Sequence, residues 1–297
     1  MHPDYAASLR EFGKPRLLPR SGSWILERSI GDLGYKDAMG CYPIFCCLNW
    51  DGLRADLDEL SDELVSISMV VDPFGPCTEE ALRACFEDKV VRFKQHFVAD
   101  LRRPTADIVS HHHHYYAKRA LKTVRVERCD DPSKFLNEWI GLYGNLIARH
   151  NLSGIKAFSR SAFTAQLSVP GIVVFRAVHG LETVGAHLWY VQGDIVYSHL
   201  AATNRQGYEL GAAYALYITA LETFSKHAHW INFGSGAGVN PDESDGLARF
   251  KKGWSTETLP TYFCGRIFNR EKYNQALLAR AEQDNDYFPA YRRGEFS

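Results

Sequence analysis

Lys251 is the residue whose type and surroundings best suit catalysis. It follows the glycine-rich stretch GSGAG at residues 234–238, on a segment whose pattern predicts a short helix. An ammonium group beside such a loop can meet an oxyanion or a phosphate as a point charge. The alternative is an ordinary solvated lysine next to Lys252. We expect Lys251 to take part in catalysis.

The glycine-rich stretch itself is a candidate substrate-binding loop. Gly234, Ser235 and Gly236 come directly after a predicted strand, WINFG. Glycine lets a backbone approach a ligand closely, although a plain turn has the same composition. Acidic residues follow at Asp242, Glu243 and Asp245. They could bind an amine, but the residue types favour capping of the next helix.

His199 is the second catalytic candidate, near the end of the predicted strand 194–202. A neutral imidazole there could accept a proton near pH 7. The alternative is a hydrogen-bonded structural histidine, which is also how we interpret His187.

Neither the histidine run nor the cysteines predict a metal site or a thiol nucleophile. Residues His111 to His114 are consecutive, and four such side chains cannot all face one point on a regular helix or strand. No matching second ligand cluster is visible, so we expect no metal and leave the role of the run open. The seven cysteines include no CxxC pair, which is typical of reduced, mostly buried thiols.

The elements that must position these residues are clearest in the second half of the chain. Short turns containing glycine separate three predicted strands, which favours an antiparallel meander. A helix between two later strands implies a crossover and local parallel pairing. In order, the pattern predicts helices at 131–150 and 159–167, strands at 171–178, 183–191 and 194–202, a helix at 209–228, a strand at 230–234, a short helix at 242–254 and a strand at 258–268.

The first half alternates strand and helix signals. We predict buried strands at 41–50 and 64–71, and helices at 52–64 and 78–93, the last capped by Thr78. The polar segment 102–120 is the best boundary candidate.

The chain has 297 residues and a formal net charge of −1, which gives no overall attraction to nucleic acid. No run of eighteen apolar residues could span a membrane, and the N-terminal residues lack the apolar region of a secretory signal. We therefore expect a cytoplasmic protein. The oligomeric state stays open.

The order of elements, with its local motifs, resembles the GNAT superfamily and more closely its FemAB-like branch. The carrying segments are 194–202 (DIVYSHLAA), 208–216 (YELGAAYAL), 231–236 (INFGSG) and 245–254 (DGLARFKKGW). The last resembles a G-L-x-x-F-K-x-x-W/F-G segment of the family, with Ser255 in place of the final glycine. The resemblance implies an α+β fold, a GNAT-like mixed sheet flanked by helices. It also implies two tandem halves: residues 1–120 as a degenerate first half, and 121–297 as the catalytic half with a C-terminal tail.

This resemblance also implies roles for particular residues. It places Lys251 at the reaction centre, Phe250 and Trp254 with the substrate, and the end of the strand that carries His199 beside the acyl carbonyl. Candidate residues for binding the acyl donor are Leu200, Ala201, Ala202, Tyr208, Gly211 and Ala213. CoA-dependent members of the family bind pyrophosphate with a Q/R-x-x-G-x-G/A loop. Here Gly211 and Ala213 match its last two positions, but Tyr208 replaces the Gln or Arg at its first position.

The resemblance implies transfer of an acyl group from acyl-CoA to the amine of a small molecule, such as an amino sugar or amino-acid derivative. Acyl-CoA would act as a co-substrate, and no tightly bound cofactor is expected. Two alternatives remain. One is an aminoacyl-tRNA donor for amide or peptide-bond formation. The other is a catalytically inactive GNAT-like binding module. The acceptor amine and the acyl length are left open by the sequence.

Overall fold

A computed structural model describes residues 1–75, 78–152, 154–238, 245–280 and 286–295. The chain forms two compact units, residues 1–94 with 260–297 and residues 95–259. The boundaries lie inside β5 (Lys89–Asp100) and β11 (Glu257–Ile267), which each run from one unit into the other. The sequence-based boundary after residue 120 therefore differs from the observed division.

The first unit is built on the strand order β1-β2-β3-β4-β11. Neighbouring strands are antiparallel except β3 and β4, which are parallel. Its elements are α1 (Pro3–Ser8), β1 (Lys14–Leu18), β2 (Ser23–Ser29), β3 (Lys36–Gly40), α2 (Leu53–Glu59), β4 (Ser66–Val70), α3 (Glu79–Cys85), the 3-10 helix η3 (Ala290–Arg292) and α11 (Arg270–Ala279).

Two sequence-based expectations for this unit are wrong in part. Residues 41–50 contribute only an isolated bridge at Phe45, because Phe45 packs into the core without strand pairing on either side, and Leu48 further along the run is exposed. The helix expected at 78–93 ends at Cys85, and the chain then enters β5. Its predicted cap is confirmed, since the Thr78 side chain accepts a hydrogen bond from the backbone N–H of Ala81.

A buried ionic cluster fixes the C-terminal tail within the first unit. Asp37 is fully buried on β3, and its carboxylate accepts two hydrogen bonds from Arg292, at 2.8 and 2.9 Å. Tyr291 donates to the same carboxylate at 3.1 Å, and Arg28 lies 3.4 Å away. A buried carboxylate is tolerated only when it is paired in this way, so the cluster locks the tail in place.

The second unit is built on the strand order β5-β10-β9-β8-β7-β6, which combines antiparallel and parallel pairs. The meander of β7, β8 and β9 is antiparallel, and β10 lies parallel to β9 after a helical crossover, as the sequence predicted. The elements are α4 (Thr105–Ile108), α5 (His111–Ala120), β6 (Arg125–Arg128), η1 (Pro132–Phe135), α6 (Leu136–His150), η2 (Gly154–Lys156), α7 (Arg160–Gln166), β7 (Ile172–His179), β8 (Glu182–Gln192), β9 (Ile195–Thr203), α8 (Arg205–Glu209), α9 (Ala212–Phe224), β10 (Trp230–Gly234) and α10 (Gly246–Lys252).

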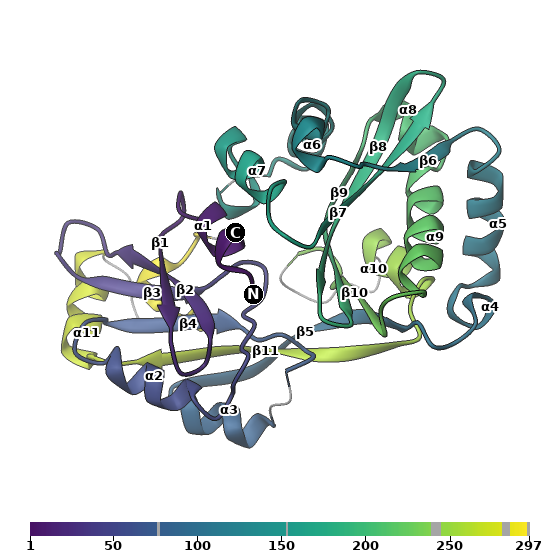
Figure 1. The fold of residues 1–297 in the computed structure, drawn as a ribbon. Coiled ribbons are helices and arrows are strands. Elements are labelled where there is room, and N and C mark those ends of the chain that lie inside the picture. The colour runs from purple at the N-terminus through teal and green to yellow at the C-terminus, as the bar shows by residue number, and fades with distance from the viewer. Residues whose placement is uncertain (76–77, 153, 239–244, 281–285, 296–297) are drawn as a thin grey trace. The chain divides into compact units, whose positions relative to one another are not determined.

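Helices cover both faces of this sheet. Figure 1 shows α9 and α5 on one side of the strands and α6 and α7 on the other. Side chains alternate accordingly: Trp189 on β8 packs against Phe224 of α9, whereas the hydroxyl of Tyr190 donates to the backbone of Gln166 in α7. The two faces around β9 therefore offer different surroundings to successive side chains.

The segment proposed as the best boundary candidate is instead part of the second unit's core. Residues 102–120 contain α4 and α5, and Ile108, Val109 and Ala117 are buried in the same cluster as Trp189. Ser110 caps α5 and also donates its backbone N–H to the carbonyl of Gly253. The polar composition hid this helix because only a narrow stripe of it is buried.

Candidate active site

The parallel pairing of β9 with β10 covers only the first part of β9. Within the described residues, the partners are Ile195 to Tyr197 on β9 and Trp230 to Asn232 on β10. β9 continues to Thr203. The register shifts in the pairing of β10 with β5 and in the pairing of β9 with β8. In β9 the extra residue at this bulge is His199. Such bulges bend and twist a strand, so β9 and β10 cease to pair where the candidate residues begin.

The glycine-rich stretch begins at the last residue of β10 and is held by hydrogen bonds to Asn232 and Asp245. Gly234 has a φ of +75°, which favours glycine, and its N–H donates to Oδ1 of Asn232 at 2.8 Å. Asp245 accepts hydrogen bonds from Ala237 at 2.6 Å, Leu247 at 2.9 Å and Ala248. Asp245 is thus the N-cap of α10, the role that the sequence favoured, and it also holds the loop. Asp242 and Glu243 lie outside the described residues.

Lys251 joins the same loop from α10. Its Nζ donates to the backbone carbonyl of Ser235 at 2.7 Å, and the side chain is half-buried. The positive charge of Lys251 also contributes to lowering the pKa of His187, after the larger effect of burial. His187 lies directly opposite Ala201 in the sheet. The Lys251 charge therefore acts on a histidine of β8 that pairs with the end of β9.

A buried polar chain lies on the α9 face of this region. Nε2 of His187 is 2.8 Å from the hydroxyl of Ser198, and Ser198 also shares a hydrogen bond with Tyr217 of α9. Burial raises the pKa of Tyr217 and lowers that of His187 well below its ordinary value, so both are neutral near pH 7. Nδ1 of His187 is buried without a hydrogen-bond partner in the described chain. The sequence analysis missed Ser198 and Tyr217, because Tyr217 fits the apolar stripe of its helix.

His199 faces the other side of the sheet. Its Nε2 lies 3.1 Å from Oε1 of the fully buried Gln166, and its ring packs against Tyr190 at 5.0 Å. Burial lowers the pKa of His199 to about 3. The imidazole is therefore neutral at pH 7, as a proton acceptor must be, but it is a weaker base than an ordinary histidine.

The predicted donor-binding residues follow His199. Leu200 is half-buried, Ala201 is exposed and Ala202 is buried, all on β9. After them the chain forms the additional helix α8. Three backbone N–H groups of this segment donate to acceptors within it. The N–H of Gly207 donates to the Asn204 side chain, that of Tyr208 to the Asn204 carbonyl, and that of Gly211 to the Tyr208 carbonyl.

The segment between β9 and α9 is therefore different from an open loop of unpaired N–H groups. Gly211 has a φ of +71° and precedes the first turn of α9, where Ala213 is half-buried. The Tyr208 side chain is exposed, and the Arg149 guanidinium lies over its ring at 4.8 Å.

The two predicted aromatic contacts differ in exposure. Phe250 is half-buried and packs edge-on against Tyr217 at 4.9 Å. Trp254 is fully buried among Tyr217, His113 and Phe250. Trp254 thus supports the site from inside the core, and only Phe250 has surface to offer to a ligand.

The histidine run has a structural role at one position. His113 is buried, with Nδ1 2.9 Å from the Ser110 hydroxyl and Nε2 2.9 Å from the carbonyl of Phe250. It therefore ties α5 to α10. Across the described ranges, no group of three or more His, Cys, Asp or Glu side chains is arranged to hold a metal ion. None of the described helices has the length and apolar composition needed to cross a bilayer.

Comparisons with known proteins agree on the fold. No protein-family model matches the chain, and no curated protein matches it. Among solved structures, FemX superposes with a TM-score of 0.69 at 15% identity, covering 92% of this chain and 95% of FemX. The C-terminal domain of a putative lysylphosphatidylglycerol synthetase from Agrobacterium fabrum gives 0.65 at 12% identity, with 94% and 90% covered.

A third similar structure is L-PGS from Bacillus licheniformis, with a TM-score of 0.60 at 14% identity and 93% and 94% covered. These likenesses extend over both units of the chain. The large mixed sheet flanked by helices agrees with them. The chain therefore has the GNAT-type, FemAB-like fold that its motifs resemble.

Proposed function

We propose that this chain is an N-acyltransferase that moves an acyl group from acyl-CoA to the amine of a small molecule, such as an amino sugar or amino-acid derivative. The observation that carries the proposal is the position of Lys251 on α10, where its Nζ donates to the carbonyl of Ser235 in the glycine-rich loop. A fold alone does not specify a reaction, so these residues and not the overall likeness support the activity.

Acyl transfer to an amine needs a polarised carbonyl and a place for the negative charge that develops on its oxygen. Lys251 fulfils this need in the proposal, because an ammonium group carries three N–H donors and can serve an oxyanion while it holds Ser235. The acyl group enters where β9 and β10 stop pairing, and the neutral His199 accepts a hydrogen bond or proton from the amine on the α7 face.

An aminoacyl-tRNA donor is the second candidate, and α8 is the observation that favours it. In this chain the N–H groups of Gly207, Tyr208 and Gly211, in the segment where a pyrophosphate-binding loop would hold CoA, already donate within α8 and its cap. FemX and the C-terminal domain of the putative lysylphosphatidylglycerol synthetase also superpose over nearly the whole chain. In the third alternative the chain binds a ligand but transfers nothing.

A combined binding and turnover experiment separates these candidates. A ligand that binds only the native state adds about 2.7 kcal/mol of stability at a hundredfold excess over its Kd. Acetyl-CoA and bulk aminoacylated tRNA are added separately while the melting temperature is followed, and release of the free CoA thiol is measured with a panel of amines. Stabilisation by acetyl-CoA with thiol release supports the first candidate, and transfer from RNA alone supports the second. Binding without transfer leaves the third.

A further inference from the structure

We propose that the outer face of α5 and the neighbouring β7–β8 turn bind the surface of an anionic lipid bilayer. We call this region the basic–apolar surface. Its residues are the cations Lys118, Arg119 and Lys122 and the apolar Leu121 and Leu181, all of them exposed. The surface lies within the second unit and shares no residue with the candidate active site, so the proposal is independent of the proposed function.

Helix α5 turns one face to the core and the opposite face to solvent. Its buried residues are His113, Ala117 and Ala120. Figure 1 shows the helix packed along the outer side of α9. Lys118 and Lys122 are four residues apart and share the solvent face, because the N–H of Lys122 donates to the Arg119 carbonyl at 3.2 Å and continues the helical course. The cations therefore gather on one exposed side.

The β7–β8 turn lies beside the end of α5. β6 follows α5 and pairs antiparallel with β7, and Nδ1–H of His179 donates to the carbonyl of Thr123 at 2.8 Å. The turn comes next along the chain, and its Leu181 side chain is fully exposed. An apolar side chain thus protrudes from a tight turn next to the end of the helix that carries the cations.

The chain does not neutralise the positive charge of this surface. Its sequence contains no Asp or Glu between residues 107 and 127. Arg125 in this segment is paired with Glu127, whereas none of the three cations of the surface has a carboxylate within 4 Å in the described part of the chain. The net charge of the whole chain is −1, so the cluster is a local feature and does not reflect the composition.

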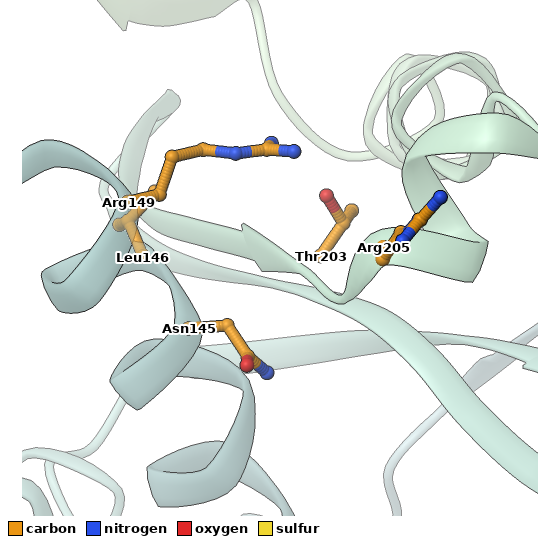
Figure 2. Close-up of a pocket in the computed structure, with 5 residues that line it drawn as sticks. All are labelled: Asn145, Leu146, Arg149, Thr203 and Arg205. Carbon is orange, nitrogen blue, oxygen red and sulfur yellow. The ribbon is translucent and has the colours of Figure 1, made fainter.

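Two further cations at this end of the sheet are already engaged. β9 is antiparallel to β8 and ends beside the β7–β8 turn. Figure 2 shows Arg149 reaching from α6 toward the end of β9, where Thr203 and Arg205 lie around a hollow of about 200 Å³. Arg149 lies over the Tyr208 ring, and Nε of Arg205 is 3.0 Å from Oε1 of Glu209. An external anionic surface therefore gains more from the cations of α5.

Exposed leucines beside unpaired cations favour a lipid bilayer over a nucleic acid as the partner. Anionic headgroups attract Lys and Arg, and each charge near the membrane surface raises the affinity about fivefold. Leucine side chains are stabilised when they leave water at the boundary of headgroups and acyl chains. Single-stranded RNA instead offers phosphates and base faces, which suit cations and aromatic rings and leave Leu121 and Leu181 without a partner.

The test measures binding of the full chain to vesicles by sedimentation. Vesicles of phosphatidylcholine mixed with an equal amount of phosphatidylglycerol should bind the chain, vesicles of phosphatidylcholine alone should not, and added salt should release it. The double variant Lys118→Gln, Lys122→Gln should bind about 25-fold more weakly, and Leu181→Ser roughly fivefold more weakly or worse. The substituted side chains are all exposed, so the melting temperature should stay the same.

Lys226→Gln and Leu278→Ser are the matched controls. Both side chains are exposed, the first after α9 and the second on α11, and both variants should bind like the native chain. Equal binding of the double lysine variant and the native chain would overturn the proposal, as would equal binding to neutral and anionic vesicles. Binding of RNA that depends on Lys118 and Lys122, without binding of vesicles, would overturn it too, because the partner would then be a nucleic acid.

Discussion

Replacing Lys251 by alanine tests the central claim about the site. The side chain is half-buried, and Nζ makes a 2.7 Å hydrogen bond to the carbonyl of Ser235. Loss of one donor to a developing oxyanion costs about a hundredfold to a thousandfold in kcat, or roughly 2.7–4 kcal/mol in the activation barrier. We expect the Lys251→Ala variant to fall at least tenfold in kcat with little change in KM, since the interaction forms mainly in the transition state.

The same substitution should cost much less in stability. A hydrogen bond to a charged group contributes about 1.5–3 kcal/mol when buried, and partial exposure reduces this to about 1 kcal/mol. That loss lowers the melting temperature by roughly 2–4 °C and leaves the chain folded at assay temperature. A fall in activity therefore reports on chemistry and not on unfolding.

The assay compares initial rates of acyl transfer for the native chain, Lys251→Ala and Lys252→Ala. Lys252 is the matched control, because it is the next residue on α10, has the same charge and is exposed. It should retain full activity. If Lys251→Ala kept more than a third of the native kcat, or if both variants lost activity equally, Lys251 could not act as the oxyanion partner.

Three further outcomes follow from burial and pairing. Asp37→Ala should lower the free energy of unfolding by about 3–5 kcal/mol in urea titrations, because it leaves buried guanidinium groups without their carboxylate, whereas the exposed Asp32→Ala should change it little. Trp254→Ala should cost about 3–5 kcal/mol in the same assay, as expected of a fully buried side chain, and unchanged stability with lost substrate affinity would instead identify it as a ligand contact. Because the pKa of His199 is lowered to about 3, the unfolded chain binds more protons than the folded one between that value and the ordinary histidine range. Stability should therefore fall as the pH drops below about 6.5, and His199→Gln should reduce this slope in urea titrations at several pH values; an unchanged slope would contradict the burial of a neutral imidazole.

The sequence predicted most of the second unit correctly where the patterns are local. The strands that became β7, β8 and β9 alternate and are joined by glycine turns, with Gly180 and Gly193 at positive φ. The acidic residues before α10 also gave a correct helix start, because Asp245 is its N-cap. These signals depend on residues a few positions apart, so no knowledge of distant partners was needed.

Segments whose surroundings come from far along the chain were predicted less well. In the apolar run 41–50, Ile44, Phe45 and Cys46 are buried without forming a regular strand, and Leu48 is exposed. Segment 102–120 reads as polar, yet His113 is buried because Phe250, Tyr214 and Trp254 surround it. Composition alone cannot reveal which residues of a mixed segment will meet a partner more than a hundred positions away.

The sequence by itself determined the order of elements, the parallel crossover onto β10 and the placement of Lys251 next to a glycine-rich loop. Only the tertiary structure decided how these groups behave chemically. Burial lowers the pKa of His199, which packs against Gln166, and Ser198 joins His187 to Tyr217 across the α9 face. The physical reason is that periodicity and capping act within a few residues, whereas desolvation and charge pairing depend on every segment that folding brings together.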